Sequence, residues 1–600
     1  MRRSMGWVVA AVTIAAACGG NGDRFTDGGG PDASDDLTVA DGTSSDGPAF
    51  PDVEQPDGQC PHGCSSDLHD VIDCNDQVVE QCSGTDGCDV STGTCVNACQ
   101  AAVDNKNSVG CEYYATDLHS DDGPSVCYAV FVANTWNTAA HITVEYDGTT
   151  LPVQNFALLP QGSGKTLTYA AFNATNGLQP NDVVILFLGG SMGAAPSCSV
   201  TGITATAEGT APMMTATGVG HSFHITTDVP VVAYQISPYG SGNVAVTGAS
   251  LLIPVSAWDT NYVAMTASAE TTFTGPEINI IAAADNTQVT LLPNVALAGG
   301  GAIPSGAANT QVKFTLNKGE QANIEQNADL TGSIIQTSAP VGLMAGNPCQ
   351  RTPTGTSYCD HGEQMIPPIR ALGSEYVGVM YRSRTGEPAI WRMVGAVDGT
   401  TLTYSSAIAG APATLDQGQM VEFITATPFV VSSQDDKHPF LLVEYMSGSQ
   451  WTQMKDLGGY GDPDLSIVIP PAQYLSHYVF MTDPTYPETN LVVIRRPDAN
   501  NNFQDVNLDC AGTLPQSGQT WQTIGKYQYT RVDLQTGDFQ NVGNCSNGRH
   551  EMDSAAPFGL WVWGWGTPKT STFTGNVSYA YPGGMNVQPI NTVVVPPTPK

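Results

Sequence analysis

The main part of the chain, from residue 111 onward, consists of short apolar runs separated by turn-forming residues. The runs are rich in Val, Ile, Thr and Tyr, and Gly, Asn, Asp and Pro stand between them. Examples lie at 128–133, 142–146, 183–187 and 278–281. Their length and composition are typical of β-strands, and no long stretch has the period of about 3.6 residues that marks an amphipathic helix. The pattern predicts an all-β fold.

One arrangement of prolines and tyrosines recurs here at intervals of about 100 to 120 residues. Four apolar strands are expected to open with a proline: Pro230, Pro340, Pro439 and Pro557. The first three are followed by another proline and, eight residues beyond it, by a tyrosine: Pro254 and Tyr262, Pro368 and Tyr376, Pro470 and Tyr478. Residues 112–115 are similar to 375–378 and indicate the start of an earlier copy.

These copies predict about four tandem β-repeats. No Ser/Pro-rich linker separates them, so we expect each repeat to pack against its neighbours. A repeat of this length has room for about six to eight strands, which fits either two blades of a β-propeller or one immunoglobulin-like sandwich. We narrowly favour a closed, propeller-like arrangement over tandem β-sandwiches.

The beginning of the sequence has the features of an export signal. Arg2 and Arg3 precede an apolar run over 5–17, which is too short to remain as a membrane-spanning helix. Three alanines then precede Cys18, an order that resembles the lipobox of bacterial lipoproteins. We therefore expect a signal peptide at 1–17 and a diacylated Cys18 as the mature N-terminus. The alternative is ordinary cleavage nearby, with Cys18 incidental.

The segment 18–59 combines this cysteine with an acidic linker. Ten acidic residues stand against one arginine, and large apolar residues are few. Such a segment cannot bury a core, so the sequence predicts a disordered spacer. Calcium binding is the less favoured alternative, because the acids lack the fixed spacing of a calcium loop.

A cysteine-rich stretch follows, and we assign 60–110 to a small module. The cysteines of the stretch are Cys60, Cys64, Cys74, Cys82, Cys88, Cys95 and Cys99, together with Cys111, which directly follows the module. So many cysteines in so short a segment predict a disulfide framework, although the connectivity is left open. Zinc bound by Cys60, Cys64, His69 and Cys74 is the competing reading, and an oxidising compartment disfavours it.

Charge and cysteine content narrow the function further. Asp and Glu number 56 against 21 Lys and Arg, for a net charge of -35, so the chain repels nucleic acid. Fifteen cysteines are typical of an exported protein, and the 14 that remain after Cys18 can pair completely. Adjacency in sequence and this even count predict Cys127–Cys198, Cys349–Cys359 and Cys510–Cys545.

The stretch around the second recurring proline has a distinctive sequence. It comprises 329–340, 346–349 and 358–368, with 375–377 shortly after it. This block resembles the N-terminal domain of the IgG-Fc-binding protein family, and especially lipoproteins of myxobacterial type, which pair that domain with a Cys-rich segment. Gly110 begins a Gly-Cys-Glu-Tyr-Tyr start of the same kind.

Because of this resemblance, we assign residues 111–600 to a β-domain like the N-terminal domain of the IgG-Fc-binding protein family. The resemblance implies adhesion or matrix binding rather than catalysis, and it does not imply that this chain binds immunoglobulin. The vertebrate relative continues into Cys-rich repeats of von Willebrand type, and these repeats are missing from the sequence.

The predicted Cys349–Cys359 bridge closes a short loop and makes Arg351, Asp360 and His361 a candidate binding loop. The favoured alternative is that the bridge only pins an insertion, and that Asp360 and His361 make local hydrogen bonds.

Four other motifs have a chemical interpretation, and a structural one is favoured for each. Ser191 within 189–193 formally matches a nucleophile elbow, but no helix follows, so a glycine turn is favoured. His221 and His224 suggest a metal, yet positions three apart in a strand face opposite sides. Asp462 and Asp464 indicate a turn rather than a calcium site.

The fourth motif is aromatic: Trp561, Trp563 and Trp565 alternate and share one face of a strand. Such a stripe could bind sugars, but core packing is favoured.

The sequence thus predicts a non-catalytic, lipid-anchored protein of the cell outer membrane, exposed at the surface. Its expected partners are the membrane, through the lipid, and an extracellular glycan, matrix or protein ligand. No cofactor, metal or catalytic residue is expected. The alternative functions are a structural envelope component that assembles with partner proteins and, less favoured, a secreted hydrolase.

Overall fold

The chain divides into two units, Met1–Gln59 and Cys60–Lys600. The computed structural model describes residues 62–123, 126–190, 198, 213–240, 246–268, 275–356, 358–449, 459–570 and 575–599. The predicted signal peptide, Cys18 and the acidic linker lie outside these residues, and so does Cys60.

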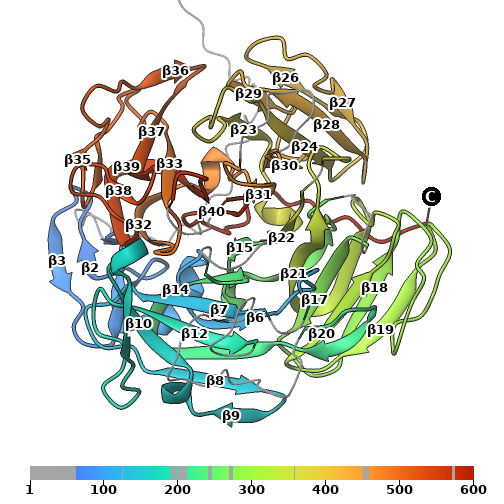
Figure 1. Cartoon of the computed structure of the whole chain (residues 1–600), viewed down its shortest axis with the longest axis horizontal. Coiled ribbons are helices and arrows are strands. Elements are labelled where there is room, and N and C mark those ends of the chain that lie inside the picture. Colours follow the sequence, from blue (N-terminus) through green and yellow to red (C-terminus); the bar gives the residue numbers. More distant parts are fainter. Residues whose placement is uncertain are drawn as a thin grey trace, which may run out of the picture. The chain divides into compact units, whose positions relative to one another are not determined.

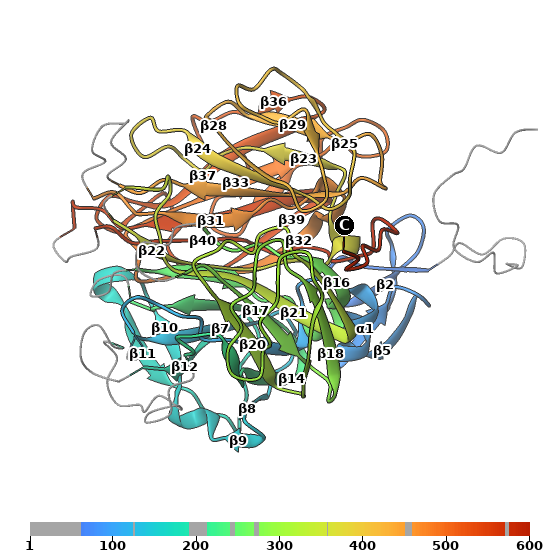
Figure 2. The ribbon, with the colours of Figure 1, turned by 90° about the vertical axis from the view of Figure 1, so that its right-hand side faces the viewer.

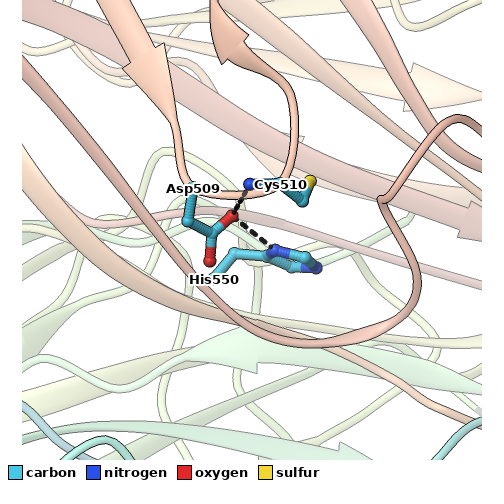
Figure 3. A group of neighbouring side chains, drawn as sticks. All are labelled: Asp509, Cys510 and His550. Atoms are coloured by element: carbon cyan, nitrogen blue, oxygen red, sulfur yellow. Dashed lines mark hydrogen bonds and ion pairs between the residues drawn. The ribbon is translucent and has the colours of Figure 1, made fainter.

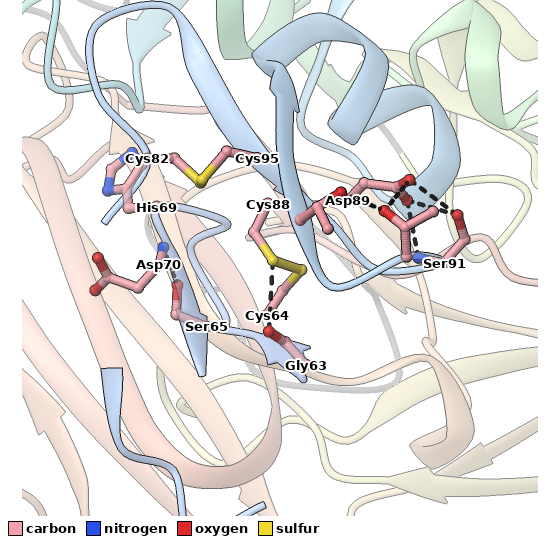
Figure 4. Close-up of a disulfide and its surroundings, with 12 residues drawn as sticks. Gly63, Cys64, Ser65, His69, Asp70, Cys82, Cys88, Asp89, Ser91 and Cys95 are labelled. Carbon is pink, nitrogen blue, oxygen red and sulfur yellow. Dashed lines mark hydrogen bonds between the residues drawn. A yellow bond between two sulfur atoms is a disulfide. The ribbon is translucent and has the colours of Figure 1, made fainter. Parts of the chain in front are cut away.

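The cysteine-rich module forms two small antiparallel sheets and one helix. Its elements are β1 (Gly63–Cys64), β2 (Asp70–Ile72), β3 (Val78–Gln81), β4 (Asp86–Asp89), β5 (Thr94–Asn97) and α1 (Ala98–Asn105). The bridges Cys64–Cys88 and Cys82–Cys95 cross it (Figure 4). Around them the buried apolar cluster of the module is very small, so covalent links replace a core, as the sequence predicted.

The module is attached to the repeats covalently and by packing. Cys99 in α1 is bridged to Cys111, which lies in the first strand of the large β-domain. Trp136 of that domain donates from Nε1 to the Gly84 carbonyl at 3.2 Å and packs edge-on against His69. The boundary expected at 110/111 therefore falls inside one compact unit.

Four consecutive β-repeats make up the rest. Repeat I (110–253) and repeat II (254–366) each contain one large antiparallel sheet. Repeat I holds β6 (Gly110–Ala115), β7 (Tyr128–Asn134), β8 (Ile142–Tyr146), β9 (Thr149–Leu151), β10 (Ala157–Gln161), β11 (Thr168–Ala171), β12 (Val183–Gly189), β14 (Phe223–Ser237) and β15 (Gly248–Leu251). Repeat II holds β16 (Asp259–Val263), β17 (Glu277–Ala282), β18 (Thr287–Leu292), β19 (Val312–Leu316), β20 (Glu320–Glu325), β21 (Ile334–Gln350) and β22 (Asp360–Met365), and β13 (Gly218–His221) joins its sheet.

Repeats III (367–469) and IV (470–590) follow the same order. Repeat III holds β23 (Glu375–Gly378), β24 (Ala389–Gly395), β25 (Thr400–Thr401), β26 (Thr403–Tyr404), β27 (Thr414–Leu415), β28 (Met420–Thr425), β29 (Phe429–Ser432), β30 (Phe440–Met446) and β31 (Asp464–Ile467). Repeat IV holds β32 (Leu475–Thr482), β33 (Glu488–Arg495), β34 (Val506–Leu508), β35 (Gly512–Thr513), β36 (Gln522–Ile524), β37 (Tyr527–Thr536), β38 (Gln540–Asn541), β39 (Gly548–Trp565) and β40 (Ser578–Pro582). Short 3-10 turns also occur at Val153–Asn155, Gly164–Thr166, Val255–Ala257, Ile369–Ala371 and Pro471–Gln473.

The recurring prolines do not all open strands, contrary to the expectation. Pro230, Pro340 and Pro557 lie in the middle of the long strands β14, β21 and β39. Because proline has no N–H to donate to the ladder, the register of the partner strands β6, β16 and β32 shifts near it. The two halves of each long strand can therefore pair with different neighbouring strands. Pro439 alone precedes its strand, because repeat III divides the same element into β29 and β30.

The recurring tyrosines make one identical contact in every repeat. Each hydroxyl donates to the carbonyl of the residue that follows the recurring proline: Tyr113 to Val231, Tyr262 to Val341, Tyr376 to Phe440 and Tyr478 to Phe558. In repeats II to IV it also accepts the N–H of the residue three positions earlier, for example Gly373 N at 2.9 Å from Tyr376 Oη. Tyr113 thus occupies the equivalent place in repeat I, which confirms the earlier copy inferred from 112–115.

The last strand of each repeat lies at the centre of the Cys60–Lys600 unit (Figure 1). β15 contacts β22, β22 contacts β31, β31 contacts β40, and β40 contacts β15, so the four repeats close into a ring. Gln364 of β22 spans this ring: its Nε2 lies 2.8–3.0 Å from the carbonyl oxygens of Ala249, Leu465 and Ala580, one on each of the other central strands.

The all-β class, the four repeats and the small disulfide module are confirmed. The closed ring is consistent with the favoured propeller-like arrangement, although the sheets of repeats I, II and IV have eight or nine strands and are larger than single blades. Beyond β40 the chain returns to the module, where Val587 N donates to the Lys106 carbonyl at 2.8 Å (Figure 2).

Three disulfides lie in the β-domain and match the predicted pairs: Cys127–Cys198, Cys349–Cys359 and Cys510–Cys545. The tryptophan stripe belongs to the core, since Trp561, Trp563 and Trp565 in β39 are at most 3% exposed. Within the described ranges, no helix combines the length and the apolar character that crossing a bilayer requires.

Candidate functional site

The predicted binding loop is only partly a loop. The Cys349–Cys359 bridge is present, and Arg351 beside it is partly exposed and donates to the Thr356 carbonyl at 3.1 Å. Asp360 and His361, however, are fully buried in β22. Asp360 and His361 therefore do not belong to the predicted binding loop, because the chain enters the central strand β22 directly after the bridge.

Asp360 instead belongs to a buried polar cluster on the axis of the ring, which we call the axial cluster. It consists of Thr247, Asp360, Asp462, Asp464 and Ser578, contributed by all four repeats. Asp360 Oδ1 accepts the Thr247 N–H at 3.1 Å, Thr247 Oγ1 donates to the Ser578 carbonyl at 2.7 Å, and Ser578 Oγ accepts the Asp462 N–H at 2.9 Å. In place of the expected turn, Asp462 lies just before β31 and Asp464 is the first residue of that strand, and both are buried.

Burial dominates the electrostatics of the axial cluster. It raises the pKa of Asp360 well above its usual range, and the nearby Asp462 and Asp464 carboxyls raise it further. Burial likewise raises the pKa of Asp464, and it raises the pKa of Asp462 to about 7. The cluster is therefore an unfavourable place for uncompensated negative charge.

His361 and Glu363 point to the other side of β22, as alternation in a strand requires. The His361 Nε2 lies 3.7 Å from Glu363 Oε2, which also accepts a hydrogen bond from Gln235. Burial and Glu363 together raise the pKa of the nearby Asp117. This second group is also fully enclosed, so it offers no surface to a large partner.

A concave surface lies between repeats III and IV, and we call it the inter-repeat groove. It has a volume of about 730 Å³, and Pro470, Pro471, Pro497 and Pro557 form much of its apolar wall. The polar lining includes Glu375, Arg496, Lys526 and Tyr527.

Glu375 is fixed inside this groove. Tyr527 Oη donates to Glu375 Oε1, and Lys526 Nζ lies 2.9 Å from the same oxygen. Burial alone would raise the pKa of Glu375, but these hydrogen bonds and the lysine charge lower it, so the carboxylate is ionised. Arg496 donates to the Pro471 carbonyl at 3.3 Å and has no carboxylate partner among the described residues. The groove therefore carries a cation that is available to a ligand.

Sequence reasoning missed this groove. Its residues come from seven separate segments between 372 and 591, and no local motif joins them. One signal was available, since Glu375 directly precedes the recurring Tyr376 and Pro470 is itself one of the recurring prolines.

A smaller cleft of about 410 Å³ between repeats I and II contains both His221 and His224. The expectation that they face opposite sides is wrong, because the chain passes from β13 to β14 between them. Both ring nitrogens of His224 contact carboxylates, Glu145 at 3.1 Å and Glu112 at 2.8 Å, so neither is available to a metal.

Among the described residues, one group of three or more His, Cys, Asp or Glu side chains has its ligand atoms within 4.8 Å of one another: Asp509, Cys510 and His550 (Figure 3). The Cys510 sulfur is bonded to Cys545, and Asp509 Oδ1 already accepts from His550 and from the Cys510 N–H. The group is therefore a structural clamp on the disulfide. Ser191 of the formal nucleophile motif lies outside the described residues.

Comparison with known proteins gives one consistent result. The family model described as IgGFc binding protein matches residues 248–564, slightly more than half of the chain. The human IgGFc-binding protein (Homo sapiens) is 24% identical over 302 residues, which are 50% of this chain and 5% of the human protein. The matched part thus spans a small fraction of that relative. No solved structure gave a significant match.

The family match begins at the first residue of β15 and ends near the end of β39. It therefore covers repeats II and III, repeat IV as far as β39, and the central strand of repeat I. The rest of repeat I lies outside the match, yet its Tyr113 makes the same contact as the tyrosines of the matched repeats. On the extent of this match, the chain belongs to the IgGFc-binding protein family.

Proposed function

We propose that this chain is a non-catalytic, lipid-anchored cell-surface protein that binds an extracellular glycan, matrix or protein ligand through the inter-repeat groove. The observation that carries the proposal is the groove itself, which combines rigid proline walls with the available Arg496 guanidinium. Proline walls lose little conformational entropy when a ligand binds, and a few fixed polar groups give orientation. Membership of a family named for binding supports the same conclusion.

The test uses cells that carry the full-length protein with Arg496→Glu. Binding to glycan arrays and matrix proteins, and cell-to-cell adhesion, should fall at least about tenfold, which corresponds to the loss of one charge-assisted contact. Lys313→Glu is the matched control, because Lys313 is an exposed cation in β19, outside the groove. If cells lacking the whole protein adhere like the wild type, the structural-component alternative gains and the adhesion proposal fails.

Three sequence features support a lipid anchor at Cys18: the basic pair Arg2 and Arg3, the short apolar run after it, and the Ala-Ala-Ala-Cys order that ends at Cys18. Two or more acyl chains hold a protein on a membrane stably, whereas one chain does so only marginally. Cys18→Ser should therefore move the protein from the outer-membrane fraction to the soluble fraction. A wild-type protein whose intact mass contains no lipid would contradict the anchor.

A further inference from the structure

Three buried oxygen atoms near the axis of the ring have no hydrogen-bond donor: Asp360 Oδ2, Asp464 Oδ2 and Gln350 Oε1. All three residues are fully buried. Buried acceptors are nearly always satisfied, so three unsatisfied oxygens on the adjoining strands β21, β22 and β31 require a chemical explanation.

These residues are neighbours on adjoining strands. Gln350 in β21 stands directly opposite Asp360 in β22. Its side-chain amide packs over Gly362, where a Cβ would lie 2.8 Å from Gln350 Cδ, and Nε2 reaches the Pro463 carbonyl at 3.4 Å. Pro463 immediately precedes Asp464. The amide oxygen of Gln350 is uncharged, so its lack of a donor does not depend on the protonation of the two carboxyls.

Positive charge is scarce around this place. The charged groups that act on Asp360 are Asp462, Asp464 and Asp122, and all three are acidic. Arg384 acts on Asp462, but its guanidinium is committed to Glu387 at 2.9 Å and to two backbone carbonyls. The described side chains therefore do not compensate the two carboxyls at the axis.

We propose that Asp360, Asp464 and Gln350 bind a divalent hard cation, calcium, on the axis of the ring. All the donors are oxygens, which suits calcium or magnesium and not zinc or copper. Calcium accepts six to eight oxygen ligands in flexible geometry, so backbone carbonyls, hydroxyls such as that of Thr247, and water can complete the set. A zinc site is disfavoured further, because His361 lies on the opposite face of β22.

The binding experiment uses the full chain, produced under oxidising conditions, stripped with EDTA and freed of chelator. Isothermal titration with CaCl2 at pH 7.5 should detect about one site per chain, and saturating calcium should raise the Tm by about 3 °C. Magnesium should act more weakly, since it demands stricter octahedral geometry. Absence of both heat and Tm shift with calcium would overturn the proposal.

Two variants and two controls locate the site. Asp360→Asn and Asp464→Asn should each abolish the calcium-dependent Tm shift. Glu444→Gln is a matched control, because Glu444 is a buried carboxyl in β30 that already accepts the Tyr381 N–H at 3.0 Å, and it should keep the full response. Asp509→Asn should keep it too. Loss of the response in Asp509→Asn alone would place the ion at the disulfide clamp and refute the axial site.

The competing explanation is a proton on the two carboxyls, one of which would then donate to Gln350. In that case calcium has no effect, and the Tm of the wild type falls between pH 5 and pH 8 more steeply than that of Asp360→Asn. If one of the variants does not fold, the wild-type titration with calcium still decides between the ion and the proton.

Discussion

At the scale of residues, one hydroxyl explains why the repeats are recognisable in sequence. The recurring tyrosine joins the start of its strand to the carbonyl beside the recurring proline, so both residues are needed at a fixed separation in space. The eight-residue spacing from Pro368 to Tyr376 was visible in the sequence, and it marked the tyrosine as a recurring position. Its partner, the Phe440 carbonyl, could not, because a backbone acceptor leaves no residue signature.

Tyr376→Phe removes this hydroxyl and nothing else. The Gly373 N–H and the Phe440 carbonyl, both in buried surroundings, lose their partner, so the free energy of unfolding should fall by about 1–3 kcal/mol. Urea unfolding of the full chain measures the difference. Tyr358→Phe is the control, because Tyr358 is 45% exposed, and it should change stability by less than about 0.5 kcal/mol. Equal stabilities for the two variants would contradict the role of the contact.

Glu444 predicts a pH dependence of stability. Burial raises its pKa to about 8, and the Tyr381 N–H and Arg531 only moderate the rise. A folded-state pKa above the unfolded value means that the folded chain keeps a proton that the unfolded chain loses. Stability from this group is therefore fully present below about pH 4.5 and is lost as the pH rises toward 8, by up to about 1.4 kcal/mol per pH unit.

Glu444→Gln should remove that slope. The difference in unfolding free energy between wild type and variant, measured at pH 5, 6.5 and 8, should shift steadily in favour of the variant. A difference that does not change with pH would show that Glu444 titrates normally. Asp483, whose pKa burial raises to about 6, contributes a separate slope at lower pH that both proteins share.

At the scale of elements, local patterns identified strands but not their extent. The apolar runs at 128–133 and 183–187 lie within β7 and β12. The long strands β14, β21 and β39 were expected to begin at their prolines, because proline normally marks the edge of a ladder. Only the neighbouring strands, which come from distant segments, show that the ladder continues on both sides of Pro230. The burial of Asp360 was missed for the same reason, since its covering strands belong to other repeats.

The bridge between α1 and β6 makes the module part of the β-domain. A fragment that begins at residue 105 lacks Cys99, so it should carry one reactive thiol at Cys111 and unfold at a lower temperature than a fragment that begins at residue 60. Thiol titration in denaturant and thermal unfolding of both fragments test this. In the chain-entropy model, a bridge over such a short loop contributes about 3 kcal/mol.

The control for that comparison is Cys99→Ala with Cys111→Ala in the longer fragment. It removes the bridge but keeps the packing of Trp136 on the module. If this variant is as stable as the intact fragment, packing alone holds the module in place.

At the scale of the whole molecule, self-similarity in sequence predicted the number of repeats but not how they meet. The ring depends on contacts of β15 with β22 and with β40, and the last two lie in other repeats. Likewise, the inter-repeat groove is assembled from segments of repeats III and IV and the stretch around Ile590. Sequence patterns report the face that a residue buries, whereas grooves and axes depend on which repeats become neighbours.

The closure of the ring determines when, during synthesis of the chain, the fold can be completed. Ser108 Oγ accepts the Met585 N–H at 3.0 Å, a contact between residues 477 positions apart. Contacts of such separation form late, because the intervening chain must first be ordered. During synthesis of the polypeptide, β15 lacks its contact with β40. The central ring of strands can form only after β40 has been synthesised. A protein built in this way stays incomplete for almost the whole of its synthesis.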